Sequence, residues 1–213
     1  MRTTPTIENE PVKHPDRLYL ASQSPRRRQL LEQLGVPCQL LLPDAHEDAE
    51  ALEVVLPGES PRAYVQRVTQ LKLDAALKRL KQRAWPAAPV LCSDTTVALG
   101  REILGKPDTP AHARQMLGML SGQTHRVLTS VVVGTPRRRE QTLSVSSVQF
   151  AHWTPSQIRR YVASGEPMGK AGAYAIQGRA SAYIADMRGS YSGIMGLPLY
   201  ETAQVLRPFG FEV

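Results

Sequence analysis

The sequence is poor in cysteine and in aromatic residues, and it contains no long apolar run. Two of its 213 residues are cysteines, Cys38 and Cys92, which lie far apart in apolar surroundings. They predict buried free thiols in a reducing compartment and argue against a disulfide framework. No apolar run is long enough to cross a bilayer, and the first residues lack the apolar core of a signal peptide. We therefore expect a cytoplasmic protein without membrane contact, in which residues 1–16 form a mobile extension.

Several catalytic motifs are also missing. The five histidines form no H-E-x-x-H pattern, which argues against a zinc hydrolase, and there is no G-x-S-x-G elbow of a serine hydrolase. The segment from Gly100 to Lys106 matches the G-x-x-x-x-G-K pattern of a P-loop, but Pro107 stands where the magnesium-binding Ser or Thr belongs. We reject a P-loop at this position, although the Lys106 ammonium can still reach a phosphate.

What remains is the composition of a basic globular protein. The formal net charge is +7, and 42% of the residues are hydrophobic, which suffices for a full core. A positive charge favours anionic partners such as nucleotides or nucleic acid. The excess is spread along the chain, and no aromatic residues alternate with the arginines of 137–139. This distribution argues against a nucleic-acid-binding protein.

Apolar periodicity predicts strands that alternate with helices. Strands are expected at 18–21, 38–42, 90–92, 123–133, 141–152 and 182–187, and helices at 25–34, 60–80, 110–120, 155–162 and 196–206. Residues 97–99 either continue the strand at 90–92 or begin a hairpin around Gly100. The segment 50–59 is expected to be irregular because it ends in Pro57 and Gly58. This order predicts an α/β protein with a mixed sheet flanked by helices, folded as one domain over residues 17–213.

The stretch from Leu18 to Gly35 carries a clear signal for an anion site. A short apolar run precedes Ser24 at a helix N-cap and Pro25 at the first helical position. A helix N-terminus offers unpaired N–H groups, and the three arginines at 26–28 add guanidinium groups that match phosphate oxygens. A capped surface helix with a solvated basic face is the alternative interpretation of the same spacing.

Two acids stand at the ends of expected strands, where ligands of open α/β sheets bind. Glu47 and Asp94 can supply the hard oxygen ligands and the base that a phosphate-cleaving site needs. Taken singly, Asp94 could merely cap a turn and Lys72 could be an ordinary residue of a helix face. Taken jointly with the anion site, they favour an enzyme with an anionic substrate. The candidate cations are Arg26, Arg27, Lys72, Lys106 and Lys170.

Six ordered blocks of sequence carry a resemblance to a known family. They are A-S-Q-S-P-R-R (21–27), S-D-T-T-V (93–97), G-K-P (105–107), L-S-G-Q-T-H (120–125), K-A-G-A-Y-A-I-Q-G (170–178) and G-L-P (196–198). From Leu18 to about Leu206 the chain resembles the Maf, or septum-formation, family. The resemblance implies a nucleoside triphosphate pyrophosphatase that uses a divalent cation, Mg²⁺ or Mn²⁺. It also implies an elongated fold like that of inosine triphosphate pyrophosphatases, with two lobes around a cleft, and often a homodimer.

The resemblance also implies roles for individual residues. Asp94 matches the acid assigned as proton acceptor, Glu47 and Asp94 would hold the metal ion, and Lys106 completes the expected catalytic set. The expected substrate-binding residues are Ser22, Ser24, Arg26, Arg27, Lys72, Thr95, Lys170 and Gln177.

Three positions distinguish the branches of this family. Arg26, Thr95 and Gln177 are similar to the branch that acts on dTTP and UTP, whereas the branch that acts on 7-methyl-GTP has Trp, Gln and Glu there. A Trp would stack on a cationic methylated purine, while Gln177 can donate to and accept from a neutral pyrimidine. We therefore expect a house-cleaning dTTP/UTP pyrophosphatase, with modified pyrimidine triphosphates as further candidate substrates.

The chain departs from the family pattern at three positions. Gly169 replaces a usual Asp, His46 replaces a usual acid, and Ala175 replaces a common glycine. These replacements bear on which side chains bind the metal ion more than on which class of substrate is used. Two alternatives remain open at this point. One is a 7-methyl-GTP pyrophosphatase, and the other is a non-catalytic basic regulator of septum formation.

Overall fold

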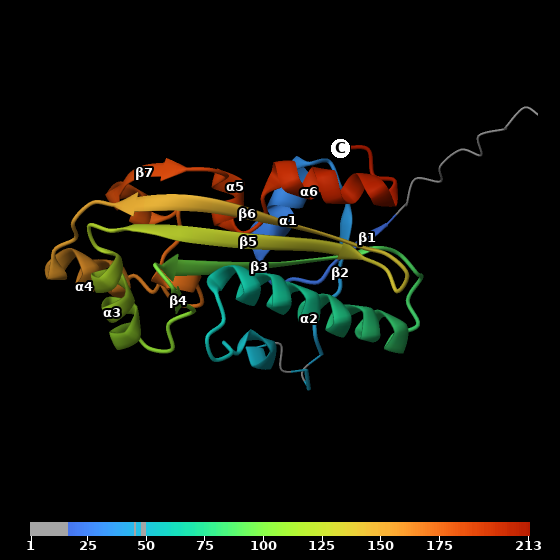
Figure 1. Ribbon diagram of the computed structural model, residues 1–213, viewed down its shortest axis with the longest axis horizontal. Coiled ribbons are helices and arrows are strands. Elements are labelled where there is room, and N and C mark those ends of the chain that lie inside the picture. Colours follow the sequence, from blue (N-terminus) through green and yellow to red (C-terminus); the bar gives the residue numbers. More distant parts are fainter. Residues whose placement is uncertain (1–16, 45, 48–49) are drawn as a thin grey trace, which may run out of the picture.

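The computed structural model describes residues 17–44, 46–47 and 50–213, so the expected extension over residues 1–16 lies outside the described part (Figure 1). The described strands form one seven-stranded sheet. They are β1 (Leu18–Leu20), β2 (Cys38–Leu40), β3 (Val90–Leu99), β4 (Glu102–Leu104), β5 (Thr124–Gly134), β6 (Arg139–Phe150) and β7 (Ile184–Arg188).

Six α-helices and four short 3₁₀ helices accompany the described sheet. The α-helices are α1 (Pro25–Gln33), α2 (Pro61–Gln82), α3 (Pro110–Leu120), α4 (Pro155–Ala163), α5 (Tyr191–Met195) and α6 (Leu199–Leu206). The 3₁₀ helices are η1 (Glu50–Glu53), η2 (Ala171–Ala173), η3 (Arg179–Tyr183) and η4 (Arg207–Phe209). None of the described helices is long and apolar enough to cross a membrane.

The sheet is mixed, as the sequence predicted. Its order is β2-β1-β3-β5-β6-β7, with β4 paired to β3. The pairs β1–β2 and β1–β3 are parallel, and the remaining pairs are antiparallel. Because β5 and β6 are long and pair along their whole length, the molecule is elongated (Figure 1).

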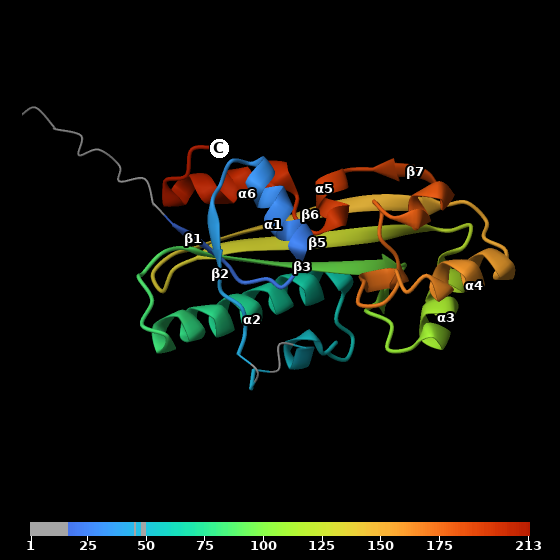
Figure 2. The ribbon, with the colours of Figure 1, turned by 180° about the vertical axis from the view of Figure 1, so that it is seen from behind.

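Alternating side chains of the long strands bury two faces of the sheet. Val90, Cys92 and Val132 pack against Leu73 and Ala76 of α2. Their neighbours Leu91, Val131 and Val133 pack on the other side with apolar residues of α1 and α6. This is the period of two that a strand imposes on its side chains. The two views show α2 on one side of the sheet and α1 and α6 on the other (Figures 1 and 2).

Strand β3 differs most from its prediction. The expected strand covered only 90–92, with 97–99 either continuing it or beginning a hairpin around Gly100. In the structure β3 runs unbroken from Val90 to Leu99, because β5 pairs with it from Val90 to Ala98, and β4 then pairs back on its end. The prediction that Asp94 stands at a strand end is therefore wrong, because it lies in the middle of β3.

Smaller differences occur elsewhere in the chain. The expected strand 182–187 begins only at Ile184, because η3 precedes it, and α5 was not predicted. The last helix begins at Leu199 instead of Gly196, and the irregular segment 50–59 contains η1. Cys92 is a buried free thiol as predicted, whereas the free thiol of Cys38 is only half-buried.

Candidate active site

A cleft of about 860 Å³ opens beside the middle of β3. On the edge away from β5, β1 pairs only with the first residues of β3, up to Leu91, and β4 pairs only from Val97 onward. The stretch 92–96 between these two neighbours has no strand on that edge in the described structure. The charged side chains that line the cleft are Arg26, Arg27, Glu47, Glu53, Lys72, Lys78, Arg79, Asp94, Lys106 and Lys170.

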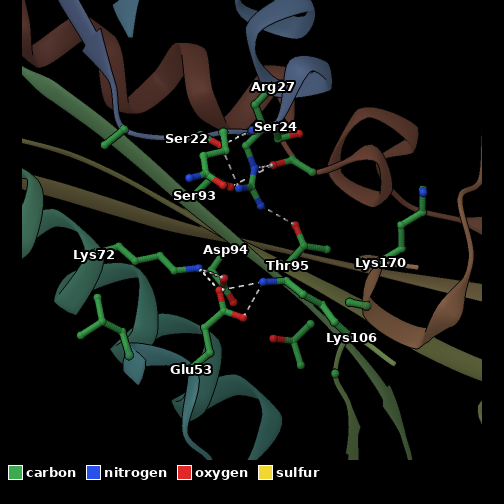
Figure 3. A pocket seen from close by; sticks show the side chains of 18 of the residues that line it. Ser22, Ser24, Arg27, Glu53, Lys72, Ser93, Asp94, Thr95, Lys106 and Lys170 are labelled. Carbon is green, nitrogen blue, oxygen red and sulfur yellow. Dashed lines mark hydrogen bonds and ion pairs between the residues drawn. The ribbon is translucent and has the colours of Figure 1, made fainter. Parts of the chain in front are cut away.

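The alternation of β3 sorts the polar residues of the site onto two faces. Asp94 shares the face of Cys92 and points towards α2, whereas Ser93 and Thr95 point towards the side of α1. Figure 3 shows these two groups on either side of the strand, with Arg27 above and Lys72 below in that view. A ligand in the cleft can therefore contact both groups across the open edge.

Asp94 is almost fully buried, with 6% of its surface exposed. Its carboxylate accepts a hydrogen bond of 2.5 Å from the Lys72 ammonium. Helix α2 holds Lys72 there because its apolar stripe packs on β3 and β5. The helix begins at Ser60, whose hydroxyl accepts from the Ala63 N–H group at 3.2 Å, and Pro61 follows as its first residue.

A second carboxylate, which the sequence did not single out, joins this pair. The Lys72 ammonium also donates to Glu53 at 2.7 Å, and the Lys106 ammonium lies 3.0 Å from the other Glu53 oxygen. Burial raises the pKa of Glu53, but the charges of Lys72 and Lys106 and their hydrogen bonds outweigh it and lower that pKa overall. Asp94, Lys72, Glu53 and Lys106 thus form a balanced group of two cations and two anions.

Arg27 is the central residue on the other side of β3. Its guanidinium donates to the Gly196 carbonyl at 2.8 Å, to the Ser22 hydroxyl at 3.2 Å and to the Thr95 hydroxyl at 3.4 Å. Burial lowers the pKa of Arg27, and the charge of Asp94 acts against this shift. The Ser24 N–H group also donates to the Ser22 hydroxyl, at 3.2 Å. The turn between β1 and α1 therefore presents a basic, hydrogen-bonding surface to the cleft.

Glu47 lines the cleft, but Arg79 binds its carboxylate. Two guanidinium nitrogens of Arg79 donate to the two Glu47 oxygens at 2.8 and 2.6 Å. The hydrogen bond from Arg79 lowers the pKa of Glu47 to about 2, against a smaller effect of burial. Arg79 follows Lys72 by seven residues, which corresponds to about 10 Å along the axis of α2. Glu47 and Asp94 are thus held by different turns of this helix, and the shared metal site expected of them stays a prediction.

Of the substrate-binding residues expected in the C-terminal half of the chain, one lines the cleft and the other does not. Lys170 lines it, but its ammonium donates to the Glu166 carbonyl at 2.5 Å, and burial and the charge of Arg26 lower the pKa of Lys170. Arg26 and Thr95 line the cleft, whereas Gln177 is exposed and is not among the lining residues. Gly169 has a φ of +70°, which explains why glycine suits this position.

The donor set fits a metal ion that arrives with a substrate. Among the described residues, no three His, Cys, Asp or Glu side chains gather as a ready metal site. Asp94 and Glu47, the two acids that the sequence predicted as ligands, both line the cleft. Mg²⁺ is usually held by one or two carboxylates together with substrate phosphates, rather than by a cage of protein ligands. Two carboxylates in a cleft rich in lysine and arginine meet that requirement.

The fold and the site define an α/β protein with a cleft for a small, phosphate-bearing anion. Its volume lies in the range of small-molecule sites, and its cations come from four separate segments. A family model described as Maf-like protein matches residues 17–209. The chain belongs to the Maf family.

Similar proteins with curated names support the same assignment. A protein of Albidiferax ferrireducens is 69% identical over 92% of this chain and 98% of its own length, and one of Polaromonas is 65% identical over 93% and 98%. A third, from Cupriavidus pinatubonensis, is 63% identical over 90% and 96%. All three are named dTTP/UTP pyrophosphatase. Among solved structures, the Ham1 protein of Staphylococcus aureus matches with a TM-score of 0.40 and 14% identity, over 64% of this chain and 72% of its own.

Proposed function

We propose that this protein is a nucleoside triphosphate pyrophosphatase that hydrolyses dTTP and UTP to the monophosphate and pyrophosphate. Membership of the Maf family and the names of relatives at 63–69% identity support this activity. The observation that carries it in the structure is the pairing of buried Asp94 with Lys72 at the open edge of β3, opposite Arg27. A base, phosphate-binding cations and a cleft of suitable size thus occur together.

Asp94 is the proposed proton acceptor. Hydrolysis adds water across the α–β phosphoanhydride bond, so one proton must leave the attacking water. The carboxylate of Asp94 faces the cleft and can take that proton. Negative charge on the phosphates is stabilised by cations that are already in place, which is the usual basis of catalysis in phosphoryl transfer. Lys72 and Lys106 supply that charge on one side of β3 and Arg27 on the other.

A divalent cation belongs to this proposal, because family members are expected to use one. Asp94 and Glu47, the pair that the sequence predicted, would hold it, and when bound it would neutralise charge on the phosphates. Ser22, Ser24 and Arg26 would bind the phosphates, because all three line the cleft at or just before the start of α1.

The proposed preference for pyrimidines rests on Arg26, Thr95 and Gln177. Arg26 and Thr95 lie in the lining of the cleft, where they can contact a bound nucleotide. Gln177 is exposed, and its proposed contact with a base requires the segment 175–179 to approach the cleft. The relatives named dTTP/UTP pyrophosphatase favour this branch over the 7-methyl-GTP branch.

The homodimer and the cytoplasmic location are further parts of the proposal. The purified full-length chain should elute as a dimer when its mass is measured by light scattering. A monomer at micromolar concentration would exclude the homodimer without affecting the proposed activity.

The activity is tested by substituting the proposed base. Wild-type protein with Mg²⁺ or Mn²⁺ should release pyrophosphate from dTTP and UTP. Asp94→Asn keeps the shape of the side chain but cannot accept the proton, so kcat should fall by about 10²–10⁴-fold. The thermal transition of the variant shows whether its fold is retained. Near-normal turnover by a folded Asp94→Asn protein would exclude Asp94 as the base.

A further inference from the structure

The carboxylate of Glu53 lies at the centre of the charged group in the cleft. It accepts from the Lys72 ammonium at 2.7 Å through Oε1, and the Lys106 ammonium lies 3.0 Å from Oε2. The Glu53 side chain is 24% exposed and that of Lys72 is 18% exposed, so solvent screens this contact less than a surface ion pair. Figure 3 shows Lys72 and Lys106 reaching Glu53 from opposite directions.

This carboxylate joins segments that are distant in the sequence. Lys72 comes from α2, Lys106 from the loop after β4, and Glu53 from η1. Two ammonium groups repel each other, and a shared carboxylate offsets that repulsion. Since Lys72 also donates to Asp94, Glu53 fixes the position of a lysine that contacts the proposed base.

The backbone around Glu53 is tied to the same helix that carries Lys72. The Tyr64 hydroxyl donates to the Glu53 carbonyl at 2.9 Å, and the Arg67 guanidinium donates to the Val54 carbonyl at 2.8 Å. Tyr64 and Lys72 are eight residues apart, a little more than two turns of α2, and both side chains bind Glu53. The carbonyl and the carboxylate of Glu53 are therefore both bound by α2.

Glu47, the acid that the family resemblance selected, is held differently. Both of its oxygens are occupied by Arg79, whose guanidinium is itself buried and also donates to the Leu41 carbonyl at 3.0 Å. Glu53 instead binds two lysines whose long stems can turn towards a phosphate. Of these two acids, Glu53 is thus the one linked to Asp94 through a shared partner.

We propose that Glu53 is a positioning residue that holds Lys72 and Lys106 together beside Asp94 until a triphosphate takes over their charges. This inference rests on the proposed pyrophosphatase activity. Glu53 acts through the two lysines, so its loss should affect the organisation of the reacting phosphates more than their binding. The Glu53 carboxylate also competes with phosphate for the same ammonium groups, so its loss should not weaken phosphate binding.

The test is the substitution Glu53→Gln, assayed with dTTP. The expected result is a kcat lower by about 10- to 100-fold, because the lysines lose their fixed geometry, with a KM that is unchanged or lower. Glu53→Asp keeps the charge on a shorter side chain, and its kcat should lie between those of the wild type and Glu53→Gln. A kcat of Glu53→Gln within about twofold of the wild type, or a loss of kcat/KM that comes entirely from a higher KM, would overturn the proposal.

The chain offers a matched control on the same segment. Glu59 pairs with Arg67 of α2 at 2.6 Å and does not line the cleft. Glu59→Gln should therefore change kcat by less than about twofold, whatever it does to stability. An equal loss of kcat in both variants would show that any broken contact between this segment and α2 has the same effect, and the specific role of Glu53 would be excluded.

Two further measurements separate this inference from the proposed activity. In the Lys106→Gln background, Glu53→Gln should lower kcat less than it does in the wild type, and strictly additive losses would contradict coupling. Calorimetry with inorganic triphosphate needs no turnover, and Glu53→Gln should bind it at least as tightly as the wild type does. Weaker binding would overturn the inference, whereas a wild type that releases no pyrophosphate would overturn the activity alone.

Discussion

Individual residues in this protein show how one residue type serves different purposes. Asp94, Glu53 and Glu47 are carboxylates at one cleft, but Lys72 joins the first two and Arg79 holds the third. Lysine is a flexible point charge that can turn to a phosphate, whereas the arginine fork binds a carboxylate in a fixed bidentate geometry. The partner, rather than the acid itself, therefore decides whether the bound cation can turn to a phosphate.

Glu47→Gln should lower the free energy of unfolding by about 2 kcal/mol at pH 7, because it leaves the buried Arg79 guanidinium without its carboxylate. The folded-state pKa of Glu47, about 2, is lower than its ordinary value of 4.5. Its contribution is therefore complete above pH 4.5 and is lost as the pH falls towards about 2. Urea denaturation of both proteins at several pH values should show the difference shrinking in that window. A difference that stays constant from pH 7 to pH 3 would contradict the assignment.

The burial of His125 predicts a second, separate pH dependence of the free energy of unfolding. It is 1% exposed, its Nε2 atom lies 2.8 Å from the Tyr174 hydroxyl, and burial lowers the pKa of His125 from 6.5 to about 4. As the pH falls, His125 takes up a proton in the unfolded chain before it does so in the folded protein. The free energy of unfolding should therefore fall by ~3 kcal/mol as the pH drops from 6.5 to 4. His125→Asn should lack this dependence, although its lost packing makes it less stable at every pH. Parallel stability curves for the two proteins between pH 7 and pH 4 would show that His125 does not titrate in this way.

At the scale of elements, β3 organises the site. The neighbouring strands β1 and β4 leave residues 92–96 of β3 without a pairing strand on one edge. The alternating side chains of β3 place Asp94 and Thr95 on opposite faces of the sheet. Helix α2 then fixes the lysine side, and the turn into α1 fixes the arginine side. The cleft therefore depends on the packing of whole elements against β3 and not on a single loop.

The segment 175–179 is held against α4 by two side chains. The Glu166 carboxylate accepts from the Tyr161 hydroxyl at 2.9 Å and from the Arg179 N–H group at 3.1 Å, and the Ala175 N–H group donates to the Tyr161 hydroxyl at 3.4 Å. A Cβ at Gly178 would lie 2.1 Å from a Glu166 oxygen. An alanine at position 178 would therefore displace the end of the Glu166 side chain from these hydrogen bonds.

Gly178→Ala should force the Glu166 carboxylate to turn away and should cost about 1–3 kcal/mol of unfolding free energy. Glu166→Ala removes the group that is struck, so the double variant should be less destabilised than the sum of the two single variants. Urea denaturation of the four proteins measures this coupling. Additive losses would mean that the clash is relieved elsewhere in the segment.

Much of the element pattern could be predicted from the sequence, because strong local signals mark it. The helices expected at 60–80 and 155–162 form, and each begins at a capping hydroxyl followed by proline, Ser60–Pro61 and Thr154–Pro155. The sequence left open whether β3 continues past its polar middle, because that stretch is stabilised by pairing with β5, which is distant in the sequence. Glu53 was missed for a similar reason, since it lies in an irregular segment and only the fold brings Lys72 and Lys106 to it.

At the scale of the whole molecule, net charge and fold act together. The chain carries a formal charge of +7, and the cleft gathers arginines and lysines from both faces of the sheet. A positive cleft of this kind raises the local concentration of anions such as nucleoside triphosphates. The Maf-like match covers residues 17–209, so the elements that build the cleft all belong to the matched region.

The central claim is tested most directly by a panel of nucleoside triphosphates, scored for pyrophosphate release by the full-length protein with Mg²⁺ or Mn²⁺. The panel contains dTTP, UTP, CTP, ATP, GTP and 7-methyl-GTP at equal concentrations, with Asp94→Asn as the inactive control. We predict release of pyrophosphate and the monophosphate from dTTP and UTP, with at least about tenfold lower kcat/KM for 7-methyl-GTP. Release from no triphosphate, or a preference for 7-methyl-GTP over dTTP and UTP, would contradict it.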